Sequence, residues 1–303
     1  MNTPHEAPGG ALRLTGVGAS ECAAALGLSQ YQTPLDIYLR KTGEAEPIVD
    51  NVPMRMGRLL EPIVLDLYEE QAGPINRQQH TLTARDHPFM FATPDALNLT
   101  GRYPVDAKTV GARSLHYWGE PGTDQVPTDY LVQVTHQMIV TQATRADIAV
   151  LMAGQDFAIY PINLDRELAD MIIEGLRLFW QRVERREPPA PTSVAEVDRL
   201  YRRSQPAAIE ADATIAATVA ELVIVREQIK LATQREDALV LDLKKYLASH
   251  DTLTHAGRTL ATWKSAKDSQ RFDAEAFKAA HPDLYAQYLK TTPGSRRLLL
   301  KGA

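Results

Sequence analysis

The chain has 303 residues, which is enough for one large domain or two. Its 44% hydrophobic and 23% charged residues are ordinary for a soluble protein with a sizeable core. The net charge of −5 argues against a protein that coats nucleic acid nonspecifically, but it leaves room for a local basic channel. The single cysteine, Cys22, excludes an internal disulfide framework and cysteine-based zinc or iron–sulfur sites. No run is long enough to span a bilayer and no apolar signal core is present, so we expect a cytoplasmic protein.

The first third of the chain predicts short helices followed by a long one. We expect residues 1–10 to be disordered, because they are polar and show no periodicity. Ser20 stands where the N-cap of a short Ala-rich helix is expected. The predicted elements are this helix over 21–26, a second helix from Thr33-Pro34 to about Gly43, a third over 54–71 and a weak strand over 75–83.

Glu61 lies at the border of the apolar stripe of the helix predicted over 54–71. Gly57 precedes it by one turn and leaves room on the same face, because it has no side chain. A glutamate at such a border is either a boundary residue with its carboxylate in water or a functional group with a partner. The stripe consists of Met56, Leu60, Ile63, Val64 and Leu67.

Two apolar segments, 91–97 and 103–109, flank the polar break Asn98-Leu99-Thr100-Gly101 and predict a β-hairpin. Side chains alternate along a strand, so Asp106 and Lys108 share one face. Asp95 stands at the end of the neighbouring strand. Two carboxylates and a lysine suit a hard divalent cation and the negative charge of a phosphate. The alternative is an ordinary exposed hairpin with solvated charges.

The next stretch completes an α/β sandwich with a mixed sheet. Pro127 opens a helix that places Gln133 and Gln137 near one face. The elements predicted here are a polar loop over 111–126, a helix over 127–141, strands over 148–152 and 157–162, and an amphipathic helix over 165–185 with Met171, Leu176, Phe179 and Trp180 inward.

Three prolines, Pro188, Pro189 and Pro191, mark a linker, and the composition changes after it. The Ala-, Glu- and Leu-rich run over 207–248 predicts helix, but its apolar spacing is broken. That favours a helical hairpin, or a helix lying on the first domain, over a long coiled coil. The predicted domains are a disordered 1–10, a core over 11–187, a linker over 188–205 and a mainly helical region over 206–303, with a β-hairpin at Ala256-Gly257, a helix from Asp273 and a strand over 296–301.

The order of these motifs resembles the PD-(D/E)XK nuclease superfamily, and within it the YqaJ-type viral recombinases with lambda exonuclease. The resemblance covers about residues 11–185. Asp106 stands where these relatives more often carry Glu, and both residue types ligate metal. The segments that carry the resemblance are Leu12-Arg13-Leu14, Gly18-Ala19-Ser20-Glu21, Met56-Gly57-Arg58-Leu59-Leu60-Glu61-Pro62, Ala92-Thr93-Pro94-Asp95-Ala96-Leu97, Val105-Asp106-Ala107-Lys108 and Tyr130-Leu131-Val132-Gln133-Val134-Thr135-His136-Gln137-Met138.

The resemblance implies a PD-(D/E)XK restriction-endonuclease-like fold, a mixed central sheet flanked by helices. It also implies that Asp95, Asp106 and the backbone carbonyl of Ala107 hold Mg²⁺ or Mn²⁺, and that Glu61 serves a second ion. Such ions activate a water and stabilise the leaving oxygen. Lys108 is then a catalytic lysine; the alternative is a partner for Asp106 across the strand face.

Gln133 is implied to position the water or the scissile phosphate; the alternative is an ordinary polar residue of a helix. Arg13, Ser20 and Thr93 are implied to contact the DNA, the first two at its 5′-phosphate. An arginine can fork two hydrogen bonds to a phosphate, and a helix N-terminus adds backbone donors. Ser20 is alternatively only a helix cap.

The activity implied by the resemblance is a phage or prophage 5′→3′ exonuclease that resects duplex DNA ends and leaves 3′ single strands. Its implied partners are DNA ends, a single-strand annealing protein and further copies of the chain in a trimer, within the bacterial cytoplasm. The alternatives are an endonuclease with the same site and a non-catalytic module that binds DNA ends.

Overall fold

The computed structural model describes residues 14–45, 50–77, 80–291 and 294–301. The chain divides into two compact units, one ending at Glu196 and the other beginning at Val197. The boundary falls within the segment 188–205, where we predicted a linker, and that segment contains a short helix, α6 (Val194–Leu200). The tail over 1–10 and Arg13 lie outside the described residues.

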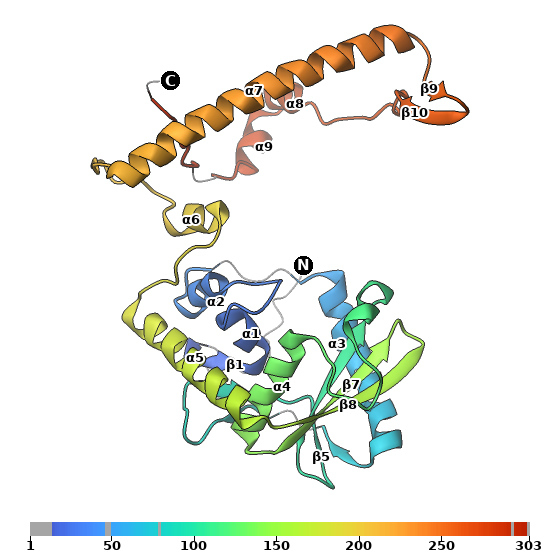
Figure 1. Ribbon diagram of the computed structural model, residues 1–303, viewed down its shortest axis with the longest axis vertical. Coiled ribbons are helices and arrows are strands. Elements are labelled where there is room, and N and C mark those ends of the chain that lie inside the picture. Colours follow the sequence, from blue (N-terminus) through green and yellow to red (C-terminus); the bar gives the residue numbers. More distant parts are fainter. Residues whose placement is uncertain (1–13, 46–49, 78–79, 292–293, 302–303) are drawn as a thin grey trace. The chain divides into compact units, whose positions relative to one another are not determined.

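The first unit is a mixed α/β structure, as predicted. Its longest helices are α3 and α5, which Figure 1 labels. The elements are β1 (Val17–Gly18), η2 (Ala19–Glu21), α1 (Cys22–Ala25), α2 (Pro34–Lys41), α3 (Val52–Ala72), β2 (Ile75–Asn76), β3 (Leu82–Thr83), β4 (Met90–Ala92), β5 (Ala96–Asn98), β6 (Pro104–Val110), η3 (Ala112–Tyr117), α4 (Thr128–Thr141), β7 (Arg145–Met152), β8 (Asp156–Asn163) and α5 (Arg166–Arg185).

The central sheet has five strands in the order β2-β5-β6-β7-β8. Strands β6 and β7 run parallel and the other neighbours run antiparallel, so the sheet is mixed. A second sheet has the order β1-β4-β3. The strand predicted over 91–97 is therefore two strands in two sheets: β4 ends at Ala92, and β5 begins at Ala96. Asp95 lies where the chain crosses from the small sheet into the large one.

Two hydrophobic clusters cover the two faces of the central sheet. On one face Val64, Leu65 and Tyr68 of α3 pack with residues of β2, β5, β6 and β7. On the other face α4 packs on β7 and β8. The predicted stripe of α3 is only partly buried, because Met56 and Ile63 are exposed whereas Val64 is buried. Only the second half of the helix lies on the sheet, and Glu61 stands just before that half.

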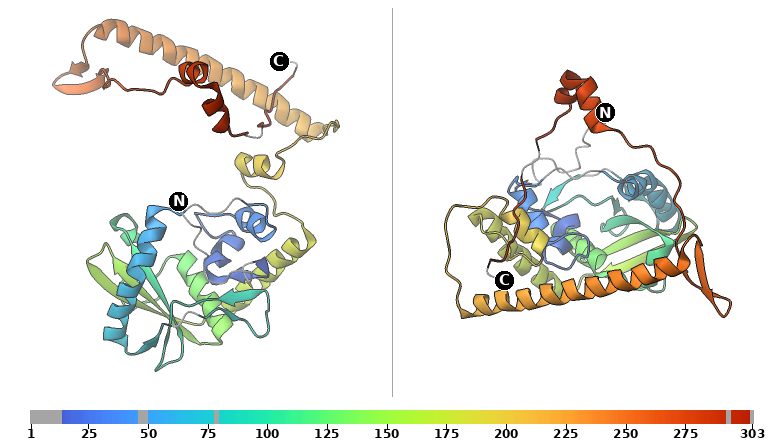
Figure 2. Two further views of the ribbon diagram at one scale, coloured as in Figure 1. Left: turned by 180° about the vertical axis from the view of Figure 1, so that it is seen from behind. Right: turned by 90° about the horizontal axis from the view of Figure 1, so that it is seen from above.

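The N-terminal helix α1 packs on the side of the central sheet that α4 covers. Helix α1 lies against α2, α4 and α5, as Figure 2 shows. Ser20 does not cap a helix as predicted: it is exposed inside η2. The Glu21 carboxylate instead accepts a hydrogen bond from the Gly18 amide at 3.1 Å and forms a buried ion pair with Lys41. On α5, Met171 is exposed, against the prediction, while Leu176 and Phe179 are buried.

The second unit is mainly helical. Its main element is α7 (Ala213–Leu247), a single uninterrupted helix of 35 residues, so the predicted helical hairpin was wrong. The remaining elements are β9 (Thr252–His255), β10 (Arg258–Thr262), α8 (Ala274–Ala280) and α9 (Pro282–Gln287). The hairpin at Ala256-Gly257 and the helix that Asp273 caps are as predicted.

The basic segment 296–301 forms no strand, against the prediction. The guanidinium of Arg296 donates to the carbonyl of Tyr201 in the same unit. Among the helices in the part of the chain that the structure describes, none combines the length and apolar character needed to cross a membrane.

Candidate functional site

Asp106 and Lys108 lie side by side on β6, as the alternation of a strand requires. The Lys108 Nζ atom lies 2.6 Å from Asp106 Oδ2, and the carboxylate is 1% exposed. Burial alone would lower the pKa of Lys108, but the charges of Asp106 and Asp95 raise it above its ordinary value. The lysine is therefore a fixed positive charge beside two acids.

Two glutamines of α4 hold the other oxygen of the same carboxylate. The Nε2 atoms of Gln133 and Gln137 each donate to Asp106 Oδ1 at 2.8 Å. The two residues are one helical turn apart and so project from one face of α4. Gln133 therefore reaches the predicted site. Gln137 is an addition that the sequence interpretation left without a role, although its spacing from Gln133 was the signal.

Asp95 faces the same place from the crossover before β5. Its Oδ2 accepts the backbone N–H of Ala107 at 2.8 Å. Burial, together with the charges of Asp106 and Glu61, raises the pKa of the Asp95 carboxyl to about 8, although Lys108 and the Ala107 amide act in the opposite direction. The charge of Glu61, on α3, is one of the smaller causes of the raised pKa of Asp95. The structure brings Asp95, Asp106 and Lys108 together, with Glu61 at the edge of the group.

The donor set fits a hard divalent cation. The Ala107 amide binds Asp95 Oδ2, and the Lys108 ammonium binds Asp106 Oδ2. Crowded carboxylates with a raised pKa are characteristic of a site that a cation would stabilise. Within the described residues, no three acidic, histidine or cysteine side chains are grouped closely enough to form a complete metal site.

The residues expected at the DNA end are less closely grouped with this site. Arg13 lies outside the described residues. Ser20 is exposed on η2. The Thr93 hydroxyl lies 2.9 Å from the Thr81 hydroxyl, in the crossover that carries Asp95.

A buried polar network that the sequence interpretation missed fixes α3 against the sheet. The Tyr68 hydroxyl donates to Asp147 Oδ2 at 2.7 Å and accepts from Asn98 Nδ2 at 3.3 Å. Arg145 binds the other oxygen of Asp147 at 2.9 Å. Tyr68 lies about two turns after Glu61 on α3, so this network places the helix that carries Glu61.

Residues 10–144 match the family model of the YqaJ-like viral recombinase domain. The resemblance predicted from the ordered motifs is therefore confirmed. The chain is also similar to the uncharacterized protein YqaJ of Bacillus subtilis strain 168. The two are 28% identical over 291 residues, which cover 92% of this chain and 89% of that protein. The similarity thus extends beyond the YqaJ-like domain into the second unit.

Among solved structures, the chain is similar to an alkaline exonuclease from Laribacter hongkongensis. The identity is 20%, the TM-score is 0.48, and the match covers 63% of this chain and 94% of that one. It is also similar to a phage-related exonuclease from Haemophilus somnus 129PT, with 13% identity and a TM-score of 0.45 over 56% of this chain and 96% of that one.

Proposed function

We propose that this protein is a metal-dependent deoxyribonuclease, and specifically a 5′→3′ exonuclease that resects duplex DNA ends and leaves 3′ single strands. The observation that carries the proposal is the convergence of Asp95, Asp106 and Lys108 beside Glu61, inside a YqaJ-like viral recombinase domain. A buried group of two carboxylates and a lysine has little value for stability, because burying charge is costly. It suits phosphodiester chemistry.

Asp95, Asp106 and the backbone carbonyl of Ala107 would hold Mg²⁺ or Mn²⁺, with Glu61 serving a second ion. When bound, the ions supply a water of lowered pKa and neutralise charge on the phosphate. Gln133 and Gln137 bind Asp106 Oδ1 and so hold the carboxylate in one orientation. The Lys108 ammonium, which now pairs with Asp106 Oδ2, would transfer to the phosphate and offset its developing charge.

The proposed preference of the nuclease for DNA ends rests on three residues. We propose that Arg13, Ser20 and Thr93 contact the 5′-phosphate and the DNA beside it. Serine and threonine hydroxyls donate to phosphate oxygens, and arginine binds them in a forked geometry. The proposed setting is phage recombination in a bacterial cytoplasm. A single-strand annealing protein would take up the 3′ strand, and copies of this chain would assemble into a trimer around the duplex.

The test is a time course on 5′-phosphorylated linear duplex and on closed circular duplex with Mg²⁺, with EDTA as the metal-free arm. We expect mononucleotides from the 5′ end of linear DNA, no cleavage of the circle, and no product in EDTA. Asp106→Ala should abolish product, whereas Met171→Ala, on the exposed side of α5, should not change the rate. Equal cleavage of both substrates would favour an endonuclease. End binding without cleavage would favour a non-catalytic module.

A further inference from the structure

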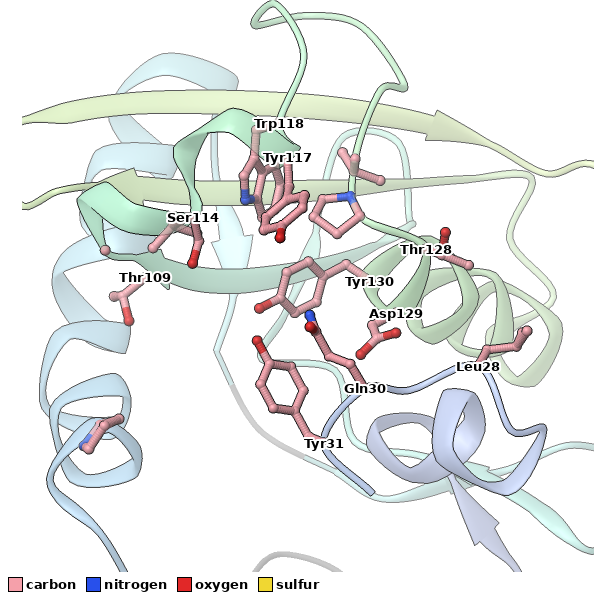
Figure 3. A pocket seen from close by; sticks show the side chains of 15 residues that line it. Leu28, Gln30, Tyr31, Thr109, Ser114, Tyr117, Trp118, Thr128, Asp129 and Tyr130 are labelled. Carbon is pink, nitrogen blue, oxygen red and sulfur yellow. The ribbon is translucent and has the colours of Figure 1, made fainter. Parts of the chain in front are cut away.

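The first unit contains a cavity of about 680 Å³ directly beside the site described above. A volume in this range suits a ligand of several hundred daltons. Four aromatic side chains line it: Tyr31, Tyr117, Trp118 and Tyr130. Figure 3 shows these side chains converging from three separate segments, the loop after α1, the segment of η3 and α4.

The cavity adjoins the candidate site at Tyr130. The Lys108 Nζ atom lies 5.3 Å from the centre of the Tyr130 ring, and Tyr130 lines the cavity. Gln133, which donates to Asp106, is one turn after Tyr130 on α4. A phosphate held beside Lys108 would therefore leave the adjoining sugar and base within reach of the cavity.

The aromatic walls differ in how firmly they are held. Trp118 stacks on Tyr130 at 5.3 Å between ring centres and contacts Tyr160 at 5.1 Å, so its ring is anchored. Tyr31 is 77% exposed and Tyr117 is 58% exposed. Exposed tyrosines that border a cavity offer ring faces on which a flat ligand can stack.

Polar groups at the rim suit the edge of a nucleobase, which presents both donors and acceptors. Gln30, Ser114, Thr128 and Asp129 line the same cavity. The Asp129 carboxylate accepts a hydrogen bond from Ser29 at 3.1 Å, which ties the loop that carries Tyr31 to α4. This hydrogen bond fixes the position of the loop that carries Tyr31 relative to α4, which carries Tyr130.

We infer that this cavity binds an unstacked nucleobase of the strand being cut, next to the scissile phosphate, with the base stacked on Tyr31 and Tyr117. The inference rests on the proposed function for its substrate class, since stacking on an aromatic face recognises any base. It explains why four aromatic side chains surround a polar-rimmed cavity at the edge of a site for phosphate chemistry. The bound base would hold the strand in position while the phosphate lies beside Lys108.

The test measures binding and needs no cleavage. A 5′-phosphorylated duplex carries a fluorescent label at its far end, and in a matched set one of the first four nucleotides of the 5′ strand is abasic. Fluorescence anisotropy in EDTA gives the Kd of each duplex. We expect the wild-type protein to bind one abasic duplex about tenfold to a hundredfold more weakly than intact DNA, as expected for one stacked base.

Tyr31→Ala should weaken the binding of intact DNA by a similar factor and should not weaken the binding of that abasic duplex further, because the base and the ring form one contact. Tyr31→Phe should restore intact-DNA affinity, and Met171→Ala should match the wild type. The inference would be overturned if Tyr31→Ala weakened the binding of the abasic duplex by the same factor as that of intact DNA, or if it did not weaken the binding of intact DNA. Either result would count even if Mg²⁺-dependent cleavage is found. If Tyr31→Ala and the abasic site affect DNA binding through the same contact but the protein cuts no DNA, the proposed nuclease activity would be refuted. The cavity would then remain a base-binding site.

Discussion

Removing one hydroxyl from the Tyr68 network should measurably destabilise the first unit. In Tyr68→Phe, Asp147 Oδ2 loses a hydrogen bond of 2.7 Å while the carboxylate stays 1% exposed. Arg145 remains on Oδ1 and keeps the acid charged. A hydrogen bond to a buried charged group contributes about 1.5–3 kcal/mol, and phenylalanine leaves no new partner in its place. We therefore expect the free energy of unfolding to fall by about 2–3 kcal/mol.

A double-mutant cycle separates this bond from a simple loss of packing. In an Asp147→Asn background the Tyr68 hydroxyl meets a neutral amide, and removing it should cost only about 1 kcal/mol. The coupling energy between the two positions should then be about 1–2 kcal/mol. The coupling energy should be favourable, because the Tyr68 hydroxyl and the Asp147 carboxylate form a direct hydrogen bond.

The assay is urea unfolding of the four proteins of the cycle in a Trp263→Phe background. Tryptophan fluorescence then reports the first unit alone, through Trp118 and Trp180. The urea concentration at the midpoint of unfolding should shift, while the slope of the unfolding free energy against urea concentration stays constant. A cost below about 0.5 kcal/mol for Tyr68→Phe, or an equal cost in both backgrounds, would refute the reasoning, because a buried charge would then not depend on the hydroxyl.

Three further predictions follow from charge. Because the pKa of Asp95 is raised from 3.8 to about 8 in the folded protein, the unfolding free energy should fall as pH rises between these values. Asp95→Asn should therefore raise the melting temperature in EDTA at pH 9 but not at pH 4; an unchanged melting temperature at pH 9 would contradict this. Burial lowers the pKa of His136 from 6.5 to about 4, so about 3 kcal/mol of stability should be lost as pH falls through this range. Its ring protons, followed by NMR, should not titrate near pH 6.5. Arg13→Ala should narrow the rate difference between 5′-phosphorylated and 5′-hydroxyl ends by about tenfold to a hundredfold, and a constant ratio would remove Arg13 from the end site.

The site was predictable from the sequence where local rules decide the geometry. The strand alternation placed Asp106 and Lys108 on one face, and the turn after Asn98 was correct. The spacing of one helical turn placed Gln133 and Gln137 together. Each of these relations depends on residues a few positions apart, which a strand or helix repeat fixes before any tertiary contact forms.

The sequence did not predict those features of the fold that depend on contacts between segments far apart in the chain. The apolar pattern of α3 predicts a continuous buried stripe, yet the sheet covers only the half around Val64 and Tyr68. The break at Thr93 and Pro94 is invisible in the pattern, because β4 and β5 are both apolar and only their partners differ. The Tyr68–Asp147 bond joins residues 79 positions apart. A single-sequence pattern holds no signal for such a pairing.

The direct pairing of Lys108 with Asp106 fits both interpretations of the lysine, and the neighbours of the carboxylate favour the catalytic role that we propose. A purely structural ion pair needs one lysine on one acid. Here the amides of Gln133 and Gln137 bind Asp106 Oδ1 and orient the carboxylate, and Lys108 contacts only Oδ2. Asp95, with its raised pKa, adds a second acid to a place that gains no stability from it. Two buried acids beside a lysine cost stability, and the divalent cation and phosphate that we propose as ligands would offset this cost by bringing positive and negative charge together.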